Sequence, residues 1–209
     1  METVCGDMCR ESIGLSKEKY SSLVFRTDVV VHAAADVRHY APDEELYKSN
    51  VAGTQHMLRL AEEGKCPFVH MSTVSVAADH LIREPEKEAV FTEACLDIGQ
   101  NWEDNGYTRT KFQAEELVFD AAKRGVTVKV FRIGRLMPRN SDGMFQKNPD
   151  TNAAYRLLRG LKELGKYPEI FDRIPFEITP VDTAAKAVAE LLESNKAVSY
   201  THLLPSCTS

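Results

Sequence analysis

The sequence predicts an α/β fold in which helices cover a parallel β-sheet. Short runs of β-branched and other apolar residues alternate with longer stretches whose apolar residues recur every three or four positions, which is typical of βαβ units. No internal repeat or low-complexity segment interrupts this alternation. At 209 residues, 43% of them hydrophobic, the chain is long enough to bury one core. We therefore expect residues 1–209 to form a single domain.

Three apolar runs predict buried strands, because strands covered on both faces are almost continuously apolar. These runs are residues 28–32, 68–71 and 126–131, and shorter candidates are residues 176–178 and 198–203. His32 and His70 lie at the ends of the first two runs. A hydrogen-bonded core histidine is expected at each position rather than a metal ligand.

The segment between the first two strands carries the signals of a helix. Pro42 stands near its start, with Asp43 and Glu44 in the first turn, and Gly64 is placed to end it. Its inward side is predicted to consist of Leu46, Asn50, Gly53, Met57 and Leu60. Asn50 is a polar group on that apolar side, so it requires a buried partner or a functional task.

Further helices are predicted over residues 106–124, 152–164 and 180–193. Gly125 and Gly165 are expected to end the first two of these, and Thr179 and Asp182 form a capping-box-like start for the third. Residues 134–150 contain two prolines and two glycines and are expected to form a long loop. Loops of this length in α/β proteins often cover a ligand.

Composition restricts the class of partner. The net charge of −5 argues against nucleic acid and against anionic membranes, and favours a small or carrier-bound substrate. No apolar run approaches the roughly 18 to 20 residues of a membrane span, and no secretion signal follows Met1, so a cytoplasmic location is expected. The five cysteines show no Cys-x-x-Cys pair, which indicates reduced thiols and no zinc site.

Tyr107 and Lys111 carry the clearest chemical signal. Their spacing of four places the phenol and the ammonium on one helix face, and the cation should lower the pKa of the tyrosine from about 10 toward the range of an effective general acid. A solvated tyrosine beside an unrelated lysine is the alternative. Ser72 and Thr73 follow a strand at the edge where parallel sheets bind ligands, so either could donate a hydrogen bond to a substrate oxygen. A simple strand-end turn would also explain them.

Seven short motifs occur in order along nearly the whole chain. They are Cys-Gly-Asp at 5–7, Val-His-Ala-Ala-Ala at 31–35, Ser-Asn-Val-Ala-Gly-Thr at 49–54, Met-Ser-Thr at 71–73, Tyr-x-x-x-Lys at 107–111, Phe-Arg-Ile-Gly-Arg at 131–135 and Thr-Pro-Val-Asp at 179–182. In this order they resemble the extended short-chain dehydrogenase/reductases. The segments at 14–16, 143–148 and 158–168 are most similar to the thioester reductase domains of nonribosomal peptide synthetases, whose relatives include carboxylic acid and fatty acyl reductases.

The resemblance implies a Rossmann-like, doubly wound parallel sheet and a catalytic triad. Thr73, Tyr107 and Lys111 match that triad: threonine orients the carbonyl, tyrosine donates the proton, and lysine holds the nicotinamide ribose. Other positions match cofactor-binding residues of the family. Asp7 matches the acidic residue that meets the adenine, and Ala33, Ala34 and Ala35 match small residues that let the cofactor approach the backbone closely. The remaining matches are Asn50, Ser72, Arg132, Ile133 and Gly134. The implied reaction is NAD(P)H-dependent reduction of an acyl or peptidyl thioester on a carrier protein to an aldehyde, with a second step to the alcohol also open. NADP is the expected cofactor, with NAD as the alternative.

The sequence also departs from that family. No Gly-x-x-Gly-x-x-Gly occurs, so the first βαβ unit with its glycine-rich loop is expected to be missing, and the chain reads as an internal piece of a larger enzyme. The strand at 29–31 then becomes an exposed edge, where pairing with a second copy is expected. A sugar-nucleotide epimerase and a non-catalytic remnant remain alternatives. A dehydratase would carry an acidic pair where Val74 and Ser75 stand.

Overall fold

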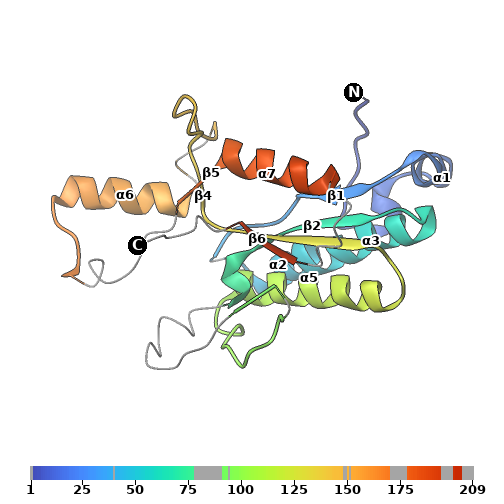
Figure 1. The fold of residues 1–209 in the computed structure, drawn as a ribbon, viewed down its shortest axis with the longest axis horizontal. Helices are drawn as coiled ribbons and strands as arrows, with labels where there is room; N and C mark the ends of the chain where they lie inside the picture. The colour runs from blue at the N-terminus through green and yellow to red at the C-terminus, as the bar shows by residue number, and fades with distance from the viewer. Residues whose placement is uncertain are drawn as a thin grey trace. The chain divides into compact units, whose positions relative to one another are not determined.

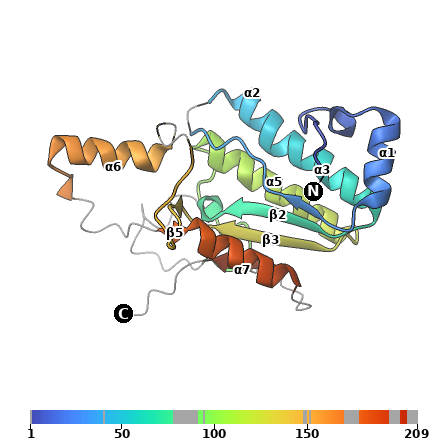
Figure 2. The same cartoon turned by 90° about the horizontal axis from the view of Figure 1, so that it is seen from above.

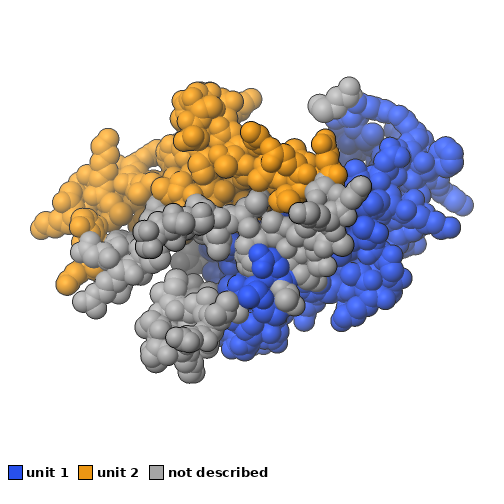
Figure 3. All heavy atoms as spheres, viewed as in Figure 1, with its two compact units in different colours: residues 1–132, 196–202 blue, residues 133–195, 203–209 orange. Residues whose placement is uncertain are grey.

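The computed structural model describes residues 2–39, 41–77, 91–93, 95–147, 150, 152–169, 178–193 and 200–203. The chain divides into two compact units, coloured separately in Figure 3. Unit 1 comprises residues 1–132 and 196–202, and unit 2 comprises residues 133–195 and 203–209. That residues 1–209 make up one domain stays a prediction.

A four-stranded sheet has the order β1-β2-β3-β6, formed by β1 (Val30–His32), β2 (Phe68–Thr73), β3 (Val128–Ile133) and β6 (Tyr200–Leu203). β1 and β2 are parallel, and their register places His32 beside His70. The predicted α/β class with a parallel sheet is confirmed, with strand boundaries shifted by one or two residues. Of the expected strand at 176–178, only Ile178 lies within the described residues, and it precedes β5 (Thr179–Pro180).

The segment between β1 and β2 is helical, as expected, but its middle is a π-helix. It begins with α2 (Asp43–Leu46), continues as η2 (Tyr47–Ala52) and ends with α3 (Gly53–Gly64). Lys65, rather than Gly64, adopts the left-handed conformation that stops it. α3 and α5 (Gly106–Lys123) pack along the same face of the sheet (Figures 1 and 2). Gly125, with φ of +100°, terminates α5 as predicted.

Two N-terminal elements were not expected from the sequence. They are the 3₁₀-helix η1 (Glu11–Gly14) and α1 (Lys17–Arg26), the latter capped by the Ser16 hydroxyl, which accepts from the Lys19 N–H at 3.4 Å. These two segments contain few apolar residues and no sustained repeat of them, so the sequence gave little sign of an amphipathic helix. Ile13 and Tyr20 nevertheless bury their side chains against α3.

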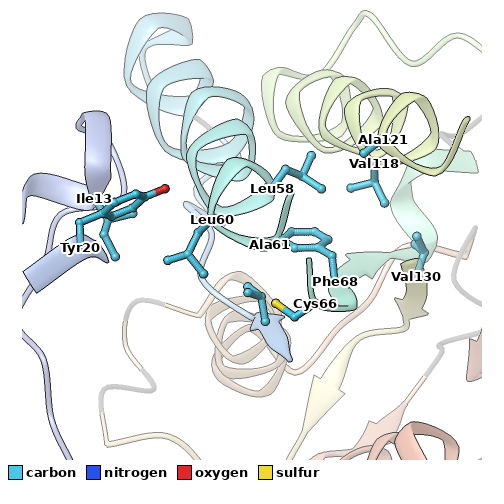
Figure 4. Close-up of a cluster of buried hydrophobic side chains, with 11 residues drawn as sticks. Ile13, Tyr20, Leu58, Leu60, Ala61, Cys66, Phe68, Val118, Ala121 and Val130 are labelled. Atoms are coloured by element: carbon cyan, nitrogen blue, oxygen red, sulfur yellow. The ribbon is translucent and has the colours of Figure 1, made fainter. Parts of the chain in front are cut away.

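The core of unit 1 lies between the four-stranded sheet and the helices α3 and α5. Figure 4 shows how α3, α5, β2 and β3 contribute to it through Leu58, Leu60, Ala61, Phe68, Val118, Ala121 and Val130, each at most 3% exposed. Burying each of the larger side chains contributes about 1.5–3 kcal/mol. This packing fixes the carboxyl end of β2 relative to the start of α5, and the candidate site lies between these two ends.

Unit 2 contains a two-stranded parallel sheet, β4 (Leu136–Met137) with β5, and the helices α6 (Ala153–Leu164) and α7 (Val181–Glu193). β4 lies inside the segment expected to be all loop. The Thr179 N–H donates to the carbonyl of Arg135, the residue before β4, and so does not take part in the expected capping box. The Asp182 carboxylate instead accepts from the N–H groups of Asn140 and Ser141, which helps lower its pKa to about 2.

Among the described residues, no helix is both long and apolar enough to cross a membrane. Of the five cysteines, the four that the structure describes are free thiols, as predicted: Cys5, Cys9, Cys66 and Cys95.

Candidate active site

The start of α5 fixes the position of Tyr107. Asn105 is the N-cap, and its side-chain oxygen accepts from the N–H groups of Tyr107 at 2.9 Å and Thr108 at 3.1 Å. Gly106 allows this turn to approach α2 closely, because a Cβ atom there would lie 2.9 Å from both Asp43 Oδ1 and Leu46 Cδ1. The backbone that carries the phenol is therefore held by a cap on one side and by α2 on the other.

Thr73 ends β2, and its hydroxyl lies near enough to the Tyr107 phenol to act on the pKa of the phenol, against the effect of burial. Thr73 also donates to Ser75 Oγ at 3.1 Å and accepts from the Ser75 N–H at 3.1 Å, which holds the threonine rotamer in place. Two of the three expected catalytic side chains thus meet at the carboxyl end of β2. Their roles in a reaction stay a proposal.

Lys111 lies one turn after Tyr107 and is 3% exposed. Its ammonium donates to the Met71 carbonyl at 2.9 Å and lies 3.3 Å from His70 Nε2. Burial lowers the pKa of Lys111 to about 8, although the Glu115 carboxylate acts in the opposite direction. The lysine is therefore turned inward toward β2 and not outward into solvent.

The pKa of Tyr107 differs from the sequence-based expectation. Burial raises it above the usual value of 10, and the Thr73 hydroxyl opposes this shift. The expected lowering of this pKa was wrong, because burial has the larger effect on the phenol; the Lys111 ammonium donates to the Met71 carbonyl and lies beside His70. Tyr107 is consequently a protonated phenol at neutral pH.

Ser72 and Arg132 belong to a buried ion-pair network. The Arg132 guanidinium donates to the Glu115 carboxylate at 2.8–3.2 Å, and both side chains have no exposed surface. The Ser72 hydroxyl donates a short hydrogen bond to the same carboxylate. Arg132 also donates to the carbonyls of Thr92 and Cys95, each at 3.0 Å. Both side chains are hydrogen-bonded to Glu115 inside the protein, so any contact of Ser72 or Arg132 with a cofactor would come from backbone atoms.

Asn50 has the buried partners that its apolar position required. Its amide N–H groups donate to the Asp36 carbonyl at 2.9 Å and to Thr110 Oγ1 at 3.0 Å, and its oxygen accepts from the Asp36 N–H at 2.7 Å. It joins η2, the segment after β1 and α5. The π-helix at this residue was invisible in the sequence, and such turns are frequent at functional sites.

The remaining expected cofactor residues are spread along the chain. Asp7 is exposed, and its Oδ1 accepts from the Cys9 N–H at 2.9 Å. The small residues Ala33, Ala34 and Ala35 follow β1, the first two exposed and the third half-buried. Ile133 and Gly134 belong to unit 2, whereas Tyr107 belongs to unit 1.

Sequence reasoning missed three residues close to Tyr107 and Lys111. The exposed His39 ring lies against the Tyr107 ring with a centroid separation of 5.2 Å, and His70 contacts the Lys111 ammonium. Glu115 follows Lys111 by four residues, a helical spacing that could have revealed it. No local signal in the sequence indicates the two histidine contacts, because they join residues more than 40 positions apart.

One pocket, of about 420 Å³, lies at the amino ends of β2 and β3 and is lined by Cys66, Pro67, Thr127 and residues of the α3 and α5 ends. None of the expected site residues line it. The candidate site is therefore defined by the cluster at the carboxyl end of β2 and not by this pocket.

A model of an NAD-binding family, described as male sterility protein, matches residues 1–188 of the chain. The chain belongs to this family. Glycine betaine reductase of Emericella nidulans is 34% identical to this member over 91% of the chain and 14% of the relative. A linear gramicidin synthase protein of Brevibacillus parabrevis is 32% identical over 98% of the chain and 4% of the relative.

Among solved structures, a thiolation-reductase di-domain from an archaeal non-ribosomal peptide synthetase matches this family member with a TM-score of 0.83 and 30% identity. The match covers 96% of this chain and 42% of that one. The resemblance to reductase domains of peptide synthetases is thereby confirmed, as is the class of NAD(P)-dependent oxidoreductases at the level of the family. The chain spans less than half of each of these three proteins.

Proposed function

We propose that this family member reduces a thioester held on a carrier protein, with NADPH as the hydride source, and releases an aldehyde and a thiol. The observation that carries the proposal is the placement of Thr73 beside the Tyr107 phenol at the carboxyl end of β2, with the buried Lys111 one helical turn away. The names of the relatives support the same class of reaction, and the archaeal di-domain pairs a reductase with a thiolation domain.

The residues present fit the nicotinamide half of such a cofactor. A protonated lysine has three N–H donors, and two of those of Lys111 are directed to Met71 and His70, so one remains for a ribose hydroxyl. Ala33 and Ala34 are small and exposed directly after β1, where a cofactor can approach the backbone. When bound, the cofactor supplies the hydride that reduces the carbonyl carbon.

The side chains of this chain would manage the proton and the carbonyl oxygen. Thr73 donates a hydrogen bond that orients the thioester oxygen, and Tyr107 transfers its phenolic proton to that oxygen as negative charge develops on it. Loss of the thiolate from the resulting hemithioacetal gives the aldehyde and frees the carrier thiol. A second round would take the aldehyde to the alcohol.

The test is Tyr107→Phe in the full chain, supplied with an acyl-loaded carrier protein. Thiol release should fall by roughly 10² to 10⁴, the usual contribution of a general acid, whereas cofactor binding should stay nearly unchanged. Binding is followed by the fluorescence of Trp102, the single tryptophan, for NADPH and NADH in separate titrations. Tyr167→Phe, at a tyrosine that is 61% exposed, is the matched control.

An equal rate of thiol release in Tyr107→Phe and the native chain would refute the assignment of the acid. If neither nucleotide changes the Trp102 signal, the non-catalytic alternative holds instead. Tighter binding of NADH than of NADPH would show that NADH, and not NADPH, is the cofactor.

We also propose that two copies associate through the β1 edge. β1 is the terminal strand of the described sheet, and Val31 in β1 and Val29 just before it are each 44% exposed. Unpaired strand edges with apolar side chains favour pairing with another chain. Sedimentation should show a dimer that Val31→Lys converts to monomer, and a native chain that sediments as a monomer would refute this pairing.

A further inference from the structure

His70 is a fully enclosed histidine that faces the lysine of the proposed site. It lies in β2, is 1% exposed, and its Nε2 is 3.3 Å from Lys111 Nζ. The neighbouring Met71 carbonyl is the other acceptor of the same ammonium, at 2.9 Å. Two consecutive residues of one strand therefore receive two of the three lysine N–H groups.

The hydrogen bonds determine which nitrogen of His70 carries the proton. An ammonium has donors and no acceptor, so Nε2 must accept from Lys111, and the neutral ring keeps its proton on Nδ1. His70 Nδ1 is the single buried side-chain nitrogen or oxygen without a hydrogen-bond partner among the described residues. An unsatisfied buried donor is unfavourable, and an apolar ring would avoid it. The histidine therefore provides an acceptor for the Lys111 ammonium at the expense of an unsatisfied donor in the core.

The groups around His70 keep its ring neutral. The ammonium of Lys111 approaches from α5, and the ring of His32 from β1, at a centroid separation of 5.6 Å. Thr54 donates its hydroxyl proton to the Asn50 carbonyl, so His32 Nε2 must donate to Thr54 and cannot serve His70. Burial first, and then Lys111 and His32, hold the pKa of His70 well below its usual value.

We propose that His70 is a positioning residue for Lys111: its neutral Nε2 aims the ammonium toward the carboxyl end of β2 and stabilises the protonated form of the lysine. A hydrogen bond accepted from the charged form of a group favours that form. His70 therefore opposes the loss of the lysine proton that burial promotes. The importance of this pair rests on the proposed function of Lys111, but the protonation of the lysine can be measured without any reaction.

The experiment compares His70→Phe with His70→Gln in the full chain. Phenylalanine keeps an aromatic ring but accepts no hydrogen bond, whereas the glutamine oxygen can reach the position of Nε2. The pKa of Lys111 is followed by NMR of ¹³C-labelled lysine, with the resonance assigned by its loss in Lys111→Arg. We expect His70→Phe to lower this pKa by about one unit, a tenfold loss of proton affinity, and His70→Gln to keep it within about 0.3 unit of the native value.

Stability separates this role from a structural one. His70→Phe removes the unsatisfied Nδ1–H donor but also leaves one N–H of the Lys111 ammonium without its acceptor, so we expect little change in the midpoint of thermal unfolding together with the lowered lysine pKa. A lower midpoint with an unmoved pKa would show a packing residue only and overturn the proposal. If His70→Phe does not fold, His70→Leu replaces it under the same criteria. A native chain that releases no thiol would leave this result intact, so the two proposals fail separately.

Discussion

Removing the charge of Glu115 should destabilise the chain strongly. In Glu115→Gln the shape is kept, but Arg132 loses the carboxylate that accepts from its Nε and Nη2 at 2.8–3.2 Å. Both side chains are 0% exposed, so water cannot replace the lost partner. Breaking a buried pair on one side costs about 3–5 kcal/mol, because a buried charge is left uncompensated.

The size of this effect can be measured by urea unfolding followed by circular dichroism, with the midpoint and slope both fitted. For a chain of this length, about 2–4 °C of unfolding temperature is lost per kcal/mol, so thermal unfolding should shift down by roughly 6–20 °C. The pKa of Lys111 should also fall below its native value of about 8, because Glu115 is the group that raises it. The two readouts are independent of each other and of any reaction.

A matched control exists on the surface. The Arg59–Glu63 pair also has a short contact, 2.8 Å, but its side chains are 63% and 39% exposed, so Glu63→Gln should cost less than about 1 kcal/mol. Replacing both members of the buried pair by apolar residues should recover most of the stability lost in Glu115→Gln. A cost for Glu115→Gln that equals that of Glu63→Gln would refute the reasoning, because burial would then have no effect on the pair.

Two further predictions concern Tyr107 and the helix that carries it. Thr73→Ala removes the hydroxyl that lowers the pKa of Tyr107, so this pKa should rise further in an NMR titration of ¹³C-labelled tyrosine, whereas Thr73→Ser should leave it unchanged; a fall in Thr73→Ala would contradict the assigned contact. Gly106→Ala should destabilise the chain by about 1–3 kcal/mol in urea unfolding, because its Cβ would lie 2.9 Å from side chains of α2, whereas Gly160→Ala, with open space in α6, should be neutral or stabilising by up to about 1 kcal/mol.

The elements that the sequence predicted well are those whose signal is local. The apolar runs that became β1, β2 and β3 and the capped, periodic segment that became α5 needed no knowledge of the rest of the chain. η1 and α1 were missed because their buried residues, Ile13 and Tyr20, are covered by packing against α3, which lies far from them in the sequence. The partner of the Thr179 N–H before α7 was missed for a related reason, since it is the Arg135 carbonyl, 44 positions away in the sequence.

In the candidate site, too, the features with a local sequence signal were predicted and those that depend on distant residues were not. The four-residue spacing of Tyr107 and Lys111 predicted a shared helix face, and the strand-end position of Thr73 predicted its place at the sheet edge. The sequence could not indicate which groups compete for the Lys111 ammonium, because Met71 and His70 lie 40 and 41 positions away. It likewise could not distinguish a cofactor contact from a buried network at Ser72, whose hydroxyl is used by Glu115.

The raised pKa of Tyr107 fits the role proposed for its phenol. A tyrosine that removes a proton from an alcohol must first become a phenolate, and burial opposes that form. A tyrosine that donates a proton to a carbonyl oxygen must be protonated, and burial favours that form. Thr73, which opposes the effect of burial on the phenol, can assist when negative charge moves to Tyr107 after its proton has left. Burial therefore keeps Tyr107 in the protonated form that the proposed reduction requires of it.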